Sequence, residues 1–227
     1  MGPEGARLLW LWVMVSATTA YFMVQAKRSK TAFEALIGAW AGILISDGYG
    51  VYTSWPGERQ TCLAHLIRAA KALKESPVRH IAACGSAAHR ELKRLCRMSR
   101  ILPTFGEIDA LHARLCKFVN NYAGYKDAAG TFARRIAREL PHLKTFLKHR
   151  GLVGPTNNHA ERTLRHGVIW RKCSHGTTSE KGDRFVERAL SIRHTCRLRK
   201  MSTFRLLVKI MHDHARSSNQ DTAWTAA

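Results

Sequence analysis

The nine residues Asn157-Asn158-His159-Ala160-Glu161-Arg162-Thr163-Leu164-Arg165 are the most informative stretch of this chain. They follow a Gly-Pro pair, which ends the preceding element. Apolar residues recur every four positions from Ala160 to Val168, so the stretch predicts a helix with one apolar face. Glu161 and Arg165 share the neighbouring face. One carboxylate among arginines near the start of a helix indicates a site that binds a metal ion and faces phosphate groups.

A purely structural role for Glu161 fits the same residues. Asn158-x-x-Glu161 has the spacing of a capping box, in which the glutamate accepts a backbone N–H at the start of the helix. Taken alone, the nine residues leave both interpretations open.

A second informative segment lies upstream. Ile43-Leu44-Ile45-Ser46-Asp47-Gly48-Tyr49 predicts a short buried strand that carries Asp47 at its end. A strand end is a rigid place to hold a catalytic carboxylate. The segment Cys62-Leu63-Ala64-His65 follows after an aromatic loop and continues into a predicted basic helix, His65 to Lys74.

Together these segments resemble the DDE transposases of the insertion-sequence 66 family. That family has an Asp-Gly-Tyr strand end, a Cys-x-Ala-His segment and an Asn-Asn-x-Ala-Glu-Arg helix. An Arg-Lys pair and a Ser-x-x-x-Gly-type loop follow the helix, and they correspond here to Arg171-Lys172 and residues 174–182. The resemblance runs from about Arg7 to Met211, and residues 157–165 are its most specific part.

The resemblance implies metal-dependent phosphodiester cleavage and strand transfer at transposon ends, with double-stranded DNA as partner. In the family two aspartates and a glutamate hold Mg²⁺ or Mn²⁺, ions that prefer carboxylate oxygens. Asp47 and Glu161 match the second and third positions. His65 falls in an element that orders the active site or contacts DNA, although an edge histidine is the alternative. The expected DNA-binding residues are Asn157, Asn158, Arg162, Arg165, Arg171 and Lys172, of which the two asparagines could instead cap the helix.

The resemblance also implies a mixed α+β fold, an RNase H-like (retroviral-integrase-like) core with a large helical insertion. Strands over 8–15 and 20–26, a helix over 31–40 and a strand over 42–47 fit a fragment of this core. In that fold another strand precedes the first pair and carries the first catalytic aspartate. No Asp precedes Asp47 in the sequence. We therefore expect a chain without the first core strand, which cleaves DNA weakly or not at all by itself.

The apolar pattern divides the chain into four predicted parts. Residues 6–75 form the first part of the core, 76–152 the helical insertion, 153–215 the rest of the core with its basic helices, and 216–227 a disordered tail. The insertion contains apolar stripes at helical spacing, which predict one packed helical core. Their residues are Ile81, Cys84, Ala88, Leu92 and Leu95, then Leu111, Leu115 and Phe118, then Phe132, Ile136, Leu140 and Leu143.

The charge of the chain points to a polyanionic partner. Its 227 residues include 37 Lys and Arg against 16 Asp and Glu, a net charge of +21. Such an excess is typical of proteins that bind nucleic acid. A non-catalytic basic DNA-binding protein explains this charge as well as an enzyme does, and in that case Glu161 is a helix cap and Asp47 an ordinary strand-end residue.

The N-terminal segment 7–20 imitates a signal peptide, but its apolar run is shorter than the ~20 residues that span a bilayer. Two strands are the favoured interpretation, and no membrane partner is expected. The six cysteines include no Cys-x-x-Cys pair, which argues against a zinc finger and favours reduced thiols. We expect a cytoplasmic, nucleoid-associated bacterial protein, with a homo-oligomer left open.

Overall fold

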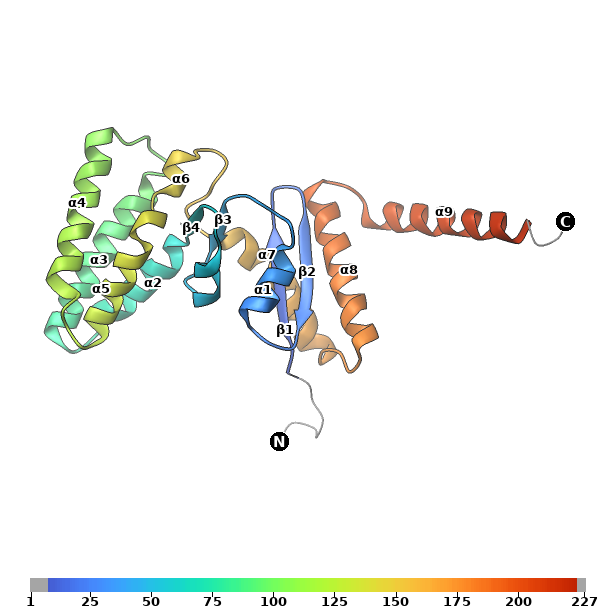
Figure 1. The fold of residues 1–227 in the computed structure, drawn as a ribbon, viewed down its shortest axis with the longest axis horizontal. Coiled ribbons are helices and arrows are strands. Elements are labelled where there is room, and N and C mark those ends of the chain that lie inside the picture. The colour runs from blue at the N-terminus through green and yellow to red at the C-terminus, as the bar shows by residue number, and fades with distance from the viewer. Residues whose placement is uncertain (1–7, 224–227) are drawn as a thin grey trace. The chain divides into compact units, whose positions relative to one another are not determined.

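The computed structural model describes residues 8–223, which form two compact units (Figure 1). Unit 1 is discontinuous, because it combines the residues up to Gly38 with those from His159 onward. Unit 2 is the continuous segment Ala39–Asn158. The fold is mixed α and β and mostly helical, and its described part contains two small sheets of two strands each.

Unit 1 begins with an antiparallel hairpin. Strands β1 (Trp10–Val15) and β2 (Ala20–Gln25) pair from Trp10 opposite Gln25 to Val15 opposite Ala20. The predicted strand pair is therefore confirmed over these residues. Arg7, where the signal-like pattern and the family resemblance begin, lies outside the described residues, as does the start of the part predicted over 6–75.

Side chains of helix α8 (Glu180–Leu198) accept hydrogen bonds from the outer edge of β2. The backbone N–H groups of Ala20, Phe22 and Val24 donate to oxygens of Thr195, Ser191 and Glu187, at 3.1, 2.9 and 2.7 Å. Alternate N–H groups of a strand lie about 6.7 Å apart, and helical residues four positions apart lie about 6 Å apart along the axis. The two spacings match closely enough for one helix face to satisfy a strand edge.

Helix α7 (Asn158–Ser174) packs closely on the hairpin and on α8. Gly167 permits this approach, because a β-carbon at that position would lie 2.4 Å from Cδ2 of Leu11 and 3.3 Å from Cδ1 of Leu190. Phe22 and Val186 are buried in the same cluster. Helix α7 is thereby fixed to the rest of unit 1 by its middle turn.

Helix α1 (Lys30–Ile37) also belongs to unit 1. Its N-cap is Ser29, whose side chain accepts the N–H of Ala32, so the helix begins one residue before the predicted start at residue 31. The helix ends at Gly38, whose φ of +56° suits a residue without a side chain, and it is shorter than the predicted span to Trp40.

Helix α9 (Thr203–Ala223) follows α8 and extends away from it (Figure 1). Its large apolar side chains include Phe204, Leu207 and Met211, which are exposed. The helix is described to Ala223; the tail predicted over 216–227 stays a prediction, and residues 224–227 lie outside the described part.

The sheet of unit 2 contains two short parallel strands. Strand β3 (Leu44–Ser46) pairs with β4 (Arg59–Thr61), with Ile45 opposite Gln60, and the 3₁₀ helix η1 (Gly50–Ser54) lies between them in sequence. Strand β4 ends at Thr61, and helix α2 begins at Leu63, two residues before the predicted start at His65.

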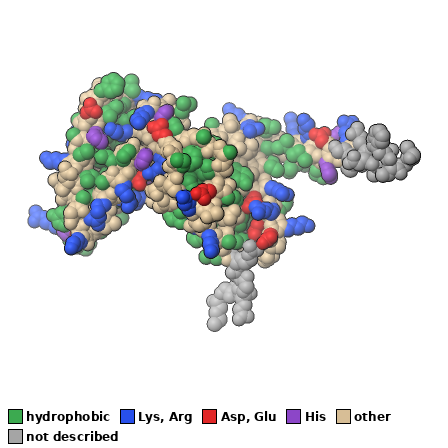
Figure 2. Space-filling view, in the orientation of Figure 1, with side chains coloured by type: hydrophobic (Ala, Val, Ile, Leu, Met, Phe, Trp, Pro, Cys, Tyr) green, Lys and Arg blue, Asp and Glu red, His purple; other side chains and the backbone are tan. Residues whose placement is uncertain are grey.

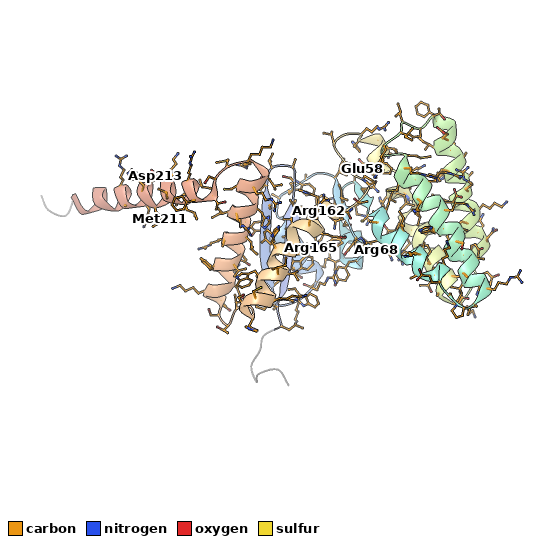
Figure 3. The ribbon with its side chains drawn as sticks, turned by 180° about the vertical axis from the view of Figure 1, so that it is seen from behind. Glu58, Arg68, Arg162, Arg165, Met211 and Asp213 are labelled. Atoms are coloured by element: carbon orange, nitrogen blue, oxygen red, sulfur yellow. The ribbon has the colours of Figure 1, made fainter. Side chains whose placement is uncertain are left out.

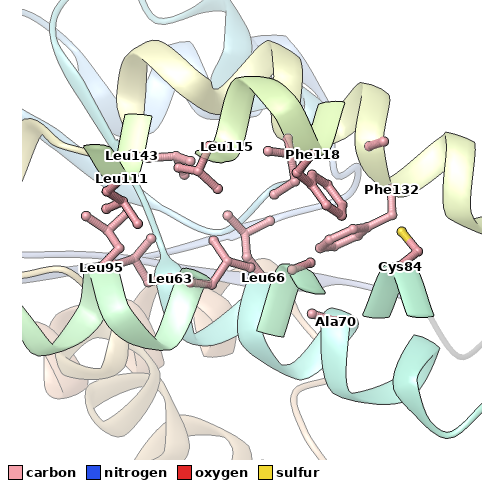
Figure 4. Close-up of a cluster of buried hydrophobic side chains, with 14 of the residues drawn as sticks. Leu63, Leu66, Ala70, Cys84, Leu95, Leu111, Leu115, Phe118, Phe132 and Leu143 are labelled. Carbon is pink, nitrogen blue, oxygen red and sulfur yellow. The ribbon is translucent and has the colours of Figure 1, made fainter. Parts of the chain in front are cut away.

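The helices of unit 2 surround one hydrophobic core (Figure 4). They are α2 (Leu63–Lys74), α3 (Arg79–Arg97), α4 (Phe105–Tyr122), α5 (Ala128–Glu139), the 3₁₀ helix η2 (Leu140–His142) and α6 (Thr145–Lys148). The three predicted apolar stripes meet in this core, with Ile81 and Leu140 at its edge. Across residues 8–223 no helix has both the length and the apolar character needed to cross a membrane.

Candidate functional site

Asp47 stands at the end of β3, as the sequence predicts. It follows Ser46, the last residue of the strand, and its side chain is half-buried. Its Oδ1 accepts the backbone N–H of Tyr49 at 2.9 Å, a turn that aspartate favours. The hydrogen bond limits the rotation of the carboxylate at the strand end.

A buried polar network fixes the neighbouring strand β4. Glu139 accepts the hydroxyl of Thr61 at 2.6 Å and pairs with Arg59 at 3.6 Å, with both charged side chains almost fully buried. Thr145 donates to the carbonyl of Arg59 at 2.6 Å. Because β4 is anchored to the end of α5 and to α6, its partner β3 has a rigid support, and so does Asp47.

Arg135 of α5 reaches the residue after Asp47. A β-carbon built on Gly48 would lie 1.9 Å from Nη2 of Arg135 and 2.7 Å from its Cζ, so the guanidinium occupies the space of a missing side chain. The sequence placed Arg135 in the helical insertion and gave it no role. A glycine directly after a predicted catalytic aspartate was the one available signal that another group approaches there.

The Cys-x-x-His segment and the Asn-Asn motif meet within unit 2. The backbone N–H of Asn157 donates to Sγ of Cys62 at 3.1 Å, and the N–H of Leu63 donates to the carbonyl of Pro155 at 2.9 Å. Cys62 is fully buried, whereas His65, in the first turn of α2, is half-buried. Two motifs far apart in the sequence are therefore joined by direct contacts.

Glu161 lies in the first turn of α7, in unit 1, and is half-buried. The same turn is held by Thr163, which donates to the carbonyl of His159 at 2.9 Å, and by a contact of 3.2 Å between Nε2 of His159 and the carbonyl of Ser16. Arg162 and Arg165 are exposed on this helix (Figure 3).

The remaining predicted DNA-binding residues are on the surface or near it. Arg171 and Lys172 are exposed in the last turn of α7, Asn158 is exposed at its start, and Asn157 is half-buried. Lys and Arg side chains are spread over the visible face of each unit rather than collected in one tail (Figure 2). The predicted residues divide between the units: Asp47, His65, Asn157 and Asn158 belong to unit 2, and Glu161 with the four basic residues belongs to unit 1.

Comparison with known proteins identifies one family. The model of the Transposase IS66 family matches residues 2–184, which is most of the chain. The matched range includes Asp47, the Cys62–His65 segment and Glu161. No curated protein and no solved structure matches the chain. The family match covers the strand end with Asp47, the joined Cys and Asn-Asn motifs and the Glu161 helix, so this chain belongs to the Transposase IS66 family.

Proposed function

We propose that this chain performs the metal-dependent phosphodiester cleavage and strand transfer of a DNA transposase, on double-stranded DNA at transposon ends. The observation that carries the proposal is the family match, which contains both acidic motifs. A DNA substrate also agrees with the net charge of +21. Action on DNA fits a cytoplasmic, nucleoid-associated protein.

Asp47 and Glu161 are the proposed ligands of Mg²⁺ or Mn²⁺. Both are half-buried carboxylates on the end of a regular element, which is the donor chemistry that these hard cations prefer. Bound metal ions would supply charge stabilisation and an activated oxygen nucleophile. Joint use of the two carboxylates is inferred from family membership, because they belong to different units.

The protein groups around the carboxylates have supporting roles in the proposal. His65 orders the acidic site or contacts the DNA near it. Arg162 and Arg165, exposed one turn apart on α7, bind phosphates, and Arg171 and Lys172 do so at the far end of the helix. Asn157 and Asn158 either contact DNA or stabilise the start of α7.

The proposed architecture is an RNase H-like core interrupted by the helices of unit 2. In support, an antiparallel hairpin, a helix and then the strand with Asp47 follow one another in the order that this fold requires. With no Asp before Asp47 in the sequence, the chain offers two of the three family carboxylates, so we propose weak cleavage or none by the chain alone.

Manganese binding tests the acidic site even when cleavage is weak. We expect Asp47→Asn and Glu161→Gln each to weaken Mn²⁺ binding, measured by electron paramagnetic resonance, and to abolish any nicking of supercoiled plasmid. Asp109→Asn is the matched control, because Asp109 is an exposed acid on α4. Duplex DNA binding should change by less than about twofold in all three variants, since none removes a cation.

The second candidate is a non-catalytic DNA-binding protein. It is favoured by the basic surface and by the capping-box spacing of Asn158 and Glu161. In that case Asp47→Asn and Glu161→Gln leave Mn²⁺ binding equal to that of Asp109→Asn, and Glu161→Gln lowers only the stability of α7. Such a result would refute the catalytic proposal and leave DNA binding intact.

A further inference from the structure

We propose that a groove between α2 and α5 of unit 2 binds the phosphodiester backbone of DNA, and that Arg135 is the positioning residue for the phosphate nearest to Asp47. The inference rests on the proposed function, because it gives the DNA of that reaction a path to the strand end. The helices α2 and α5 are neighbours in unit 2 (Figure 1).

The groove has a volume of about 850 Å³ and lies open along the two helices. Small side chains line much of it, including Ala69 and Ala72 of α2 and Ala137 of α5. Three arginines of α5 line it as well, at positions 134, 135 and 138. Small residues let an extended ligand approach the helix backbones, and the arginines give the groove three positive charges.

These three charges are not neutralised within the described part of the chain. Neither Arg135 nor Arg138 forms an ion pair there, and Arg134 donates to the carbonyls of Ala123 and Tyr125, at 2.7 and 2.9 Å, rather than to a carboxylate. Other arginines of unit 2 do have acidic partners, as Arg114 has in Glu91 at 2.8 Å. Uncompensated arginines in one groove are complementary to a polyanion.

The contact of Arg135 with Gly48 relates the groove to Asp47. Its guanidinium occupies the position where Gly48 lacks a β-carbon, directly after Asp47 in the chain. A planar guanidinium binds phosphate oxygens in a bidentate manner. A phosphate held by Arg135 would therefore lie beside the carboxylate that the proposed chemistry uses, and Gly48 is explained as the residue that makes room for this cation.

A negative charge introduced on the groove wall tests whether DNA binds in the groove. Ala137→Glu adds a negative charge at an exposed groove residue, and Ala113→Glu adds the same charge at an exposed residue of α4 outside the groove. With duplex DNA and fluorescence anisotropy at fixed salt, we expect Ala137→Glu to weaken binding roughly tenfold and Ala113→Glu by less than about twofold. Thermal melting of each variant excludes a loss of folding as the cause.

Arg135 and Gly48 form a pair for a double-mutant cycle. Arg135→Gln should weaken DNA binding roughly tenfold and lower the slope of log K against log salt by about one, while Arg135→Lys keeps the slope. Gly48 has no positive φ, so Gly48→Ala is compatible with its backbone, and the methyl group displaces the flexible end of Arg135. Gly48→Ala should therefore weaken binding as well, but not further when Arg135 is already Gln.

Three outcomes overturn the inference. Equal DNA binding by Ala137→Glu and Ala113→Glu excludes the groove, and additive effects of Gly48→Ala and Arg135→Gln exclude the assigned role of their contact. Equal losses toward polyglutamate and duplex DNA identify a general polyanion site. In each case, Mn²⁺ binding that is still lost in Asp47→Asn leaves the proposed transposase function standing, so the two failures are distinguishable.

Discussion

The imidazole rings of His166 on α7 and His194 on α8 lie 4.8 Å apart, measured between ring centroids, within unit 1. His194 is buried, and its ring also contacts Phe22 at 5.4 Å. Burial, together with the neighbouring His166, Arg193 and Arg197, lowers the pKa of His194 to about 4. A proton on this ring would place an uncompensated charge between two packed helices.

Unit 1 should therefore lose stability in mild acid. An unfolded histidine binds a proton below about pH 6.5, whereas folded His194 stays neutral down to about pH 4. The free energy of unfolding is thus fully retained above pH 6.5 and falls as the pH drops toward 4, by roughly 3 kcal/mol from this group. Urea unfolding at pH 7.5 and pH 5 measures the difference. His194→Phe should remove much of it, while the exposed-loop variant His175→Asn should keep the wild-type difference.

Substitution by alanine should have opposite effects on stability at two glycines. Gly85 lies in the close contact of α2 and α3, whereas Gly106 lies on α4. A β-carbon on Gly85 would lie 2.2 Å from the backbone nitrogen of Lys74, so Gly85→Ala forces the helices apart and should cost about 1–3 kcal/mol of unfolding free energy. Gly106, in the first turn of α4, has open space around it, and Gly106→Ala should not destabilise and should gain up to about 1 kcal/mol. Chemical denaturation of both variants checks the contrast; a neutral Gly85→Ala would disprove the tight packing.

Removal of the buried charge of Glu91 should lower the stability of unit 2. Its buried carboxylate pairs with Arg90 and Arg94 of the same helix, each at 3.0 Å, and with Arg114 of α4 at 2.8 Å, a contact that joins α3 to α4. Hydrogen bonds from Arg114 and Arg90 hold its pKa below the usual value, against the opposing effect of burial. Glu91→Gln leaves these partly exposed cations without a charged partner and should cost about 1–3 kcal/mol. Glu75→Gln removes only an exposed pair with Lys71 and should cost under about 0.5 kcal/mol in the same denaturation experiment.

Arginines of α7 should contribute to DNA affinity through charge. Arg162→Gln and Arg165→Gln should each weaken duplex binding and reduce the salt slope by about one, without changing sequence preference. Arg184 is the matched control, because it is exposed on α8 but bound to Glu187 at 2.9 Å. Anisotropy titrations over a salt series measure the slopes. A slope that changes as much in Arg184→Gln as in Arg162→Gln would contradict a specific role for α7.

The sequence predicted most elements of this fold, because their apolar periodicity was strong. The hairpin, the short strand before Asp47 and the helices of unit 2 all follow such patterns. The predicted helix ends were less accurate: α1 ends at Ile37 rather than Trp40, because Gly38 follows it, and α2 begins at Leu63 rather than His65. His80 and His149 are partly buried and paired with Asp127 and Glu58, and the sequence did not predict these pairs. Such pairings join distant segments, which periodicity does not report.

The candidate site was predictable only as a set of motifs. Asp47 stands at a strand end and Glu161 in the first turn of a helix, as expected. The contact of Asn157 with Cys62 and the approach of Arg135 to Gly48 could not be predicted, since each depends on how helices far apart in sequence fold back on one another.

The discontinuity of unit 1 has a consequence during protein synthesis. The hydrogen bonds from β2 to α8 join residues 163 to 175 positions apart, so the hairpin leaves the ribosome long before its partner helix exists. At roughly 5–20 residues per second, the wait is on the order of ten to thirty seconds. The continuous segment of unit 2 emerges complete within that interval. Until α8 has been synthesised, the edge of β2 is open to pairing with strands of other nascent chains. We therefore expect a chaperone to bind the nascent hairpin.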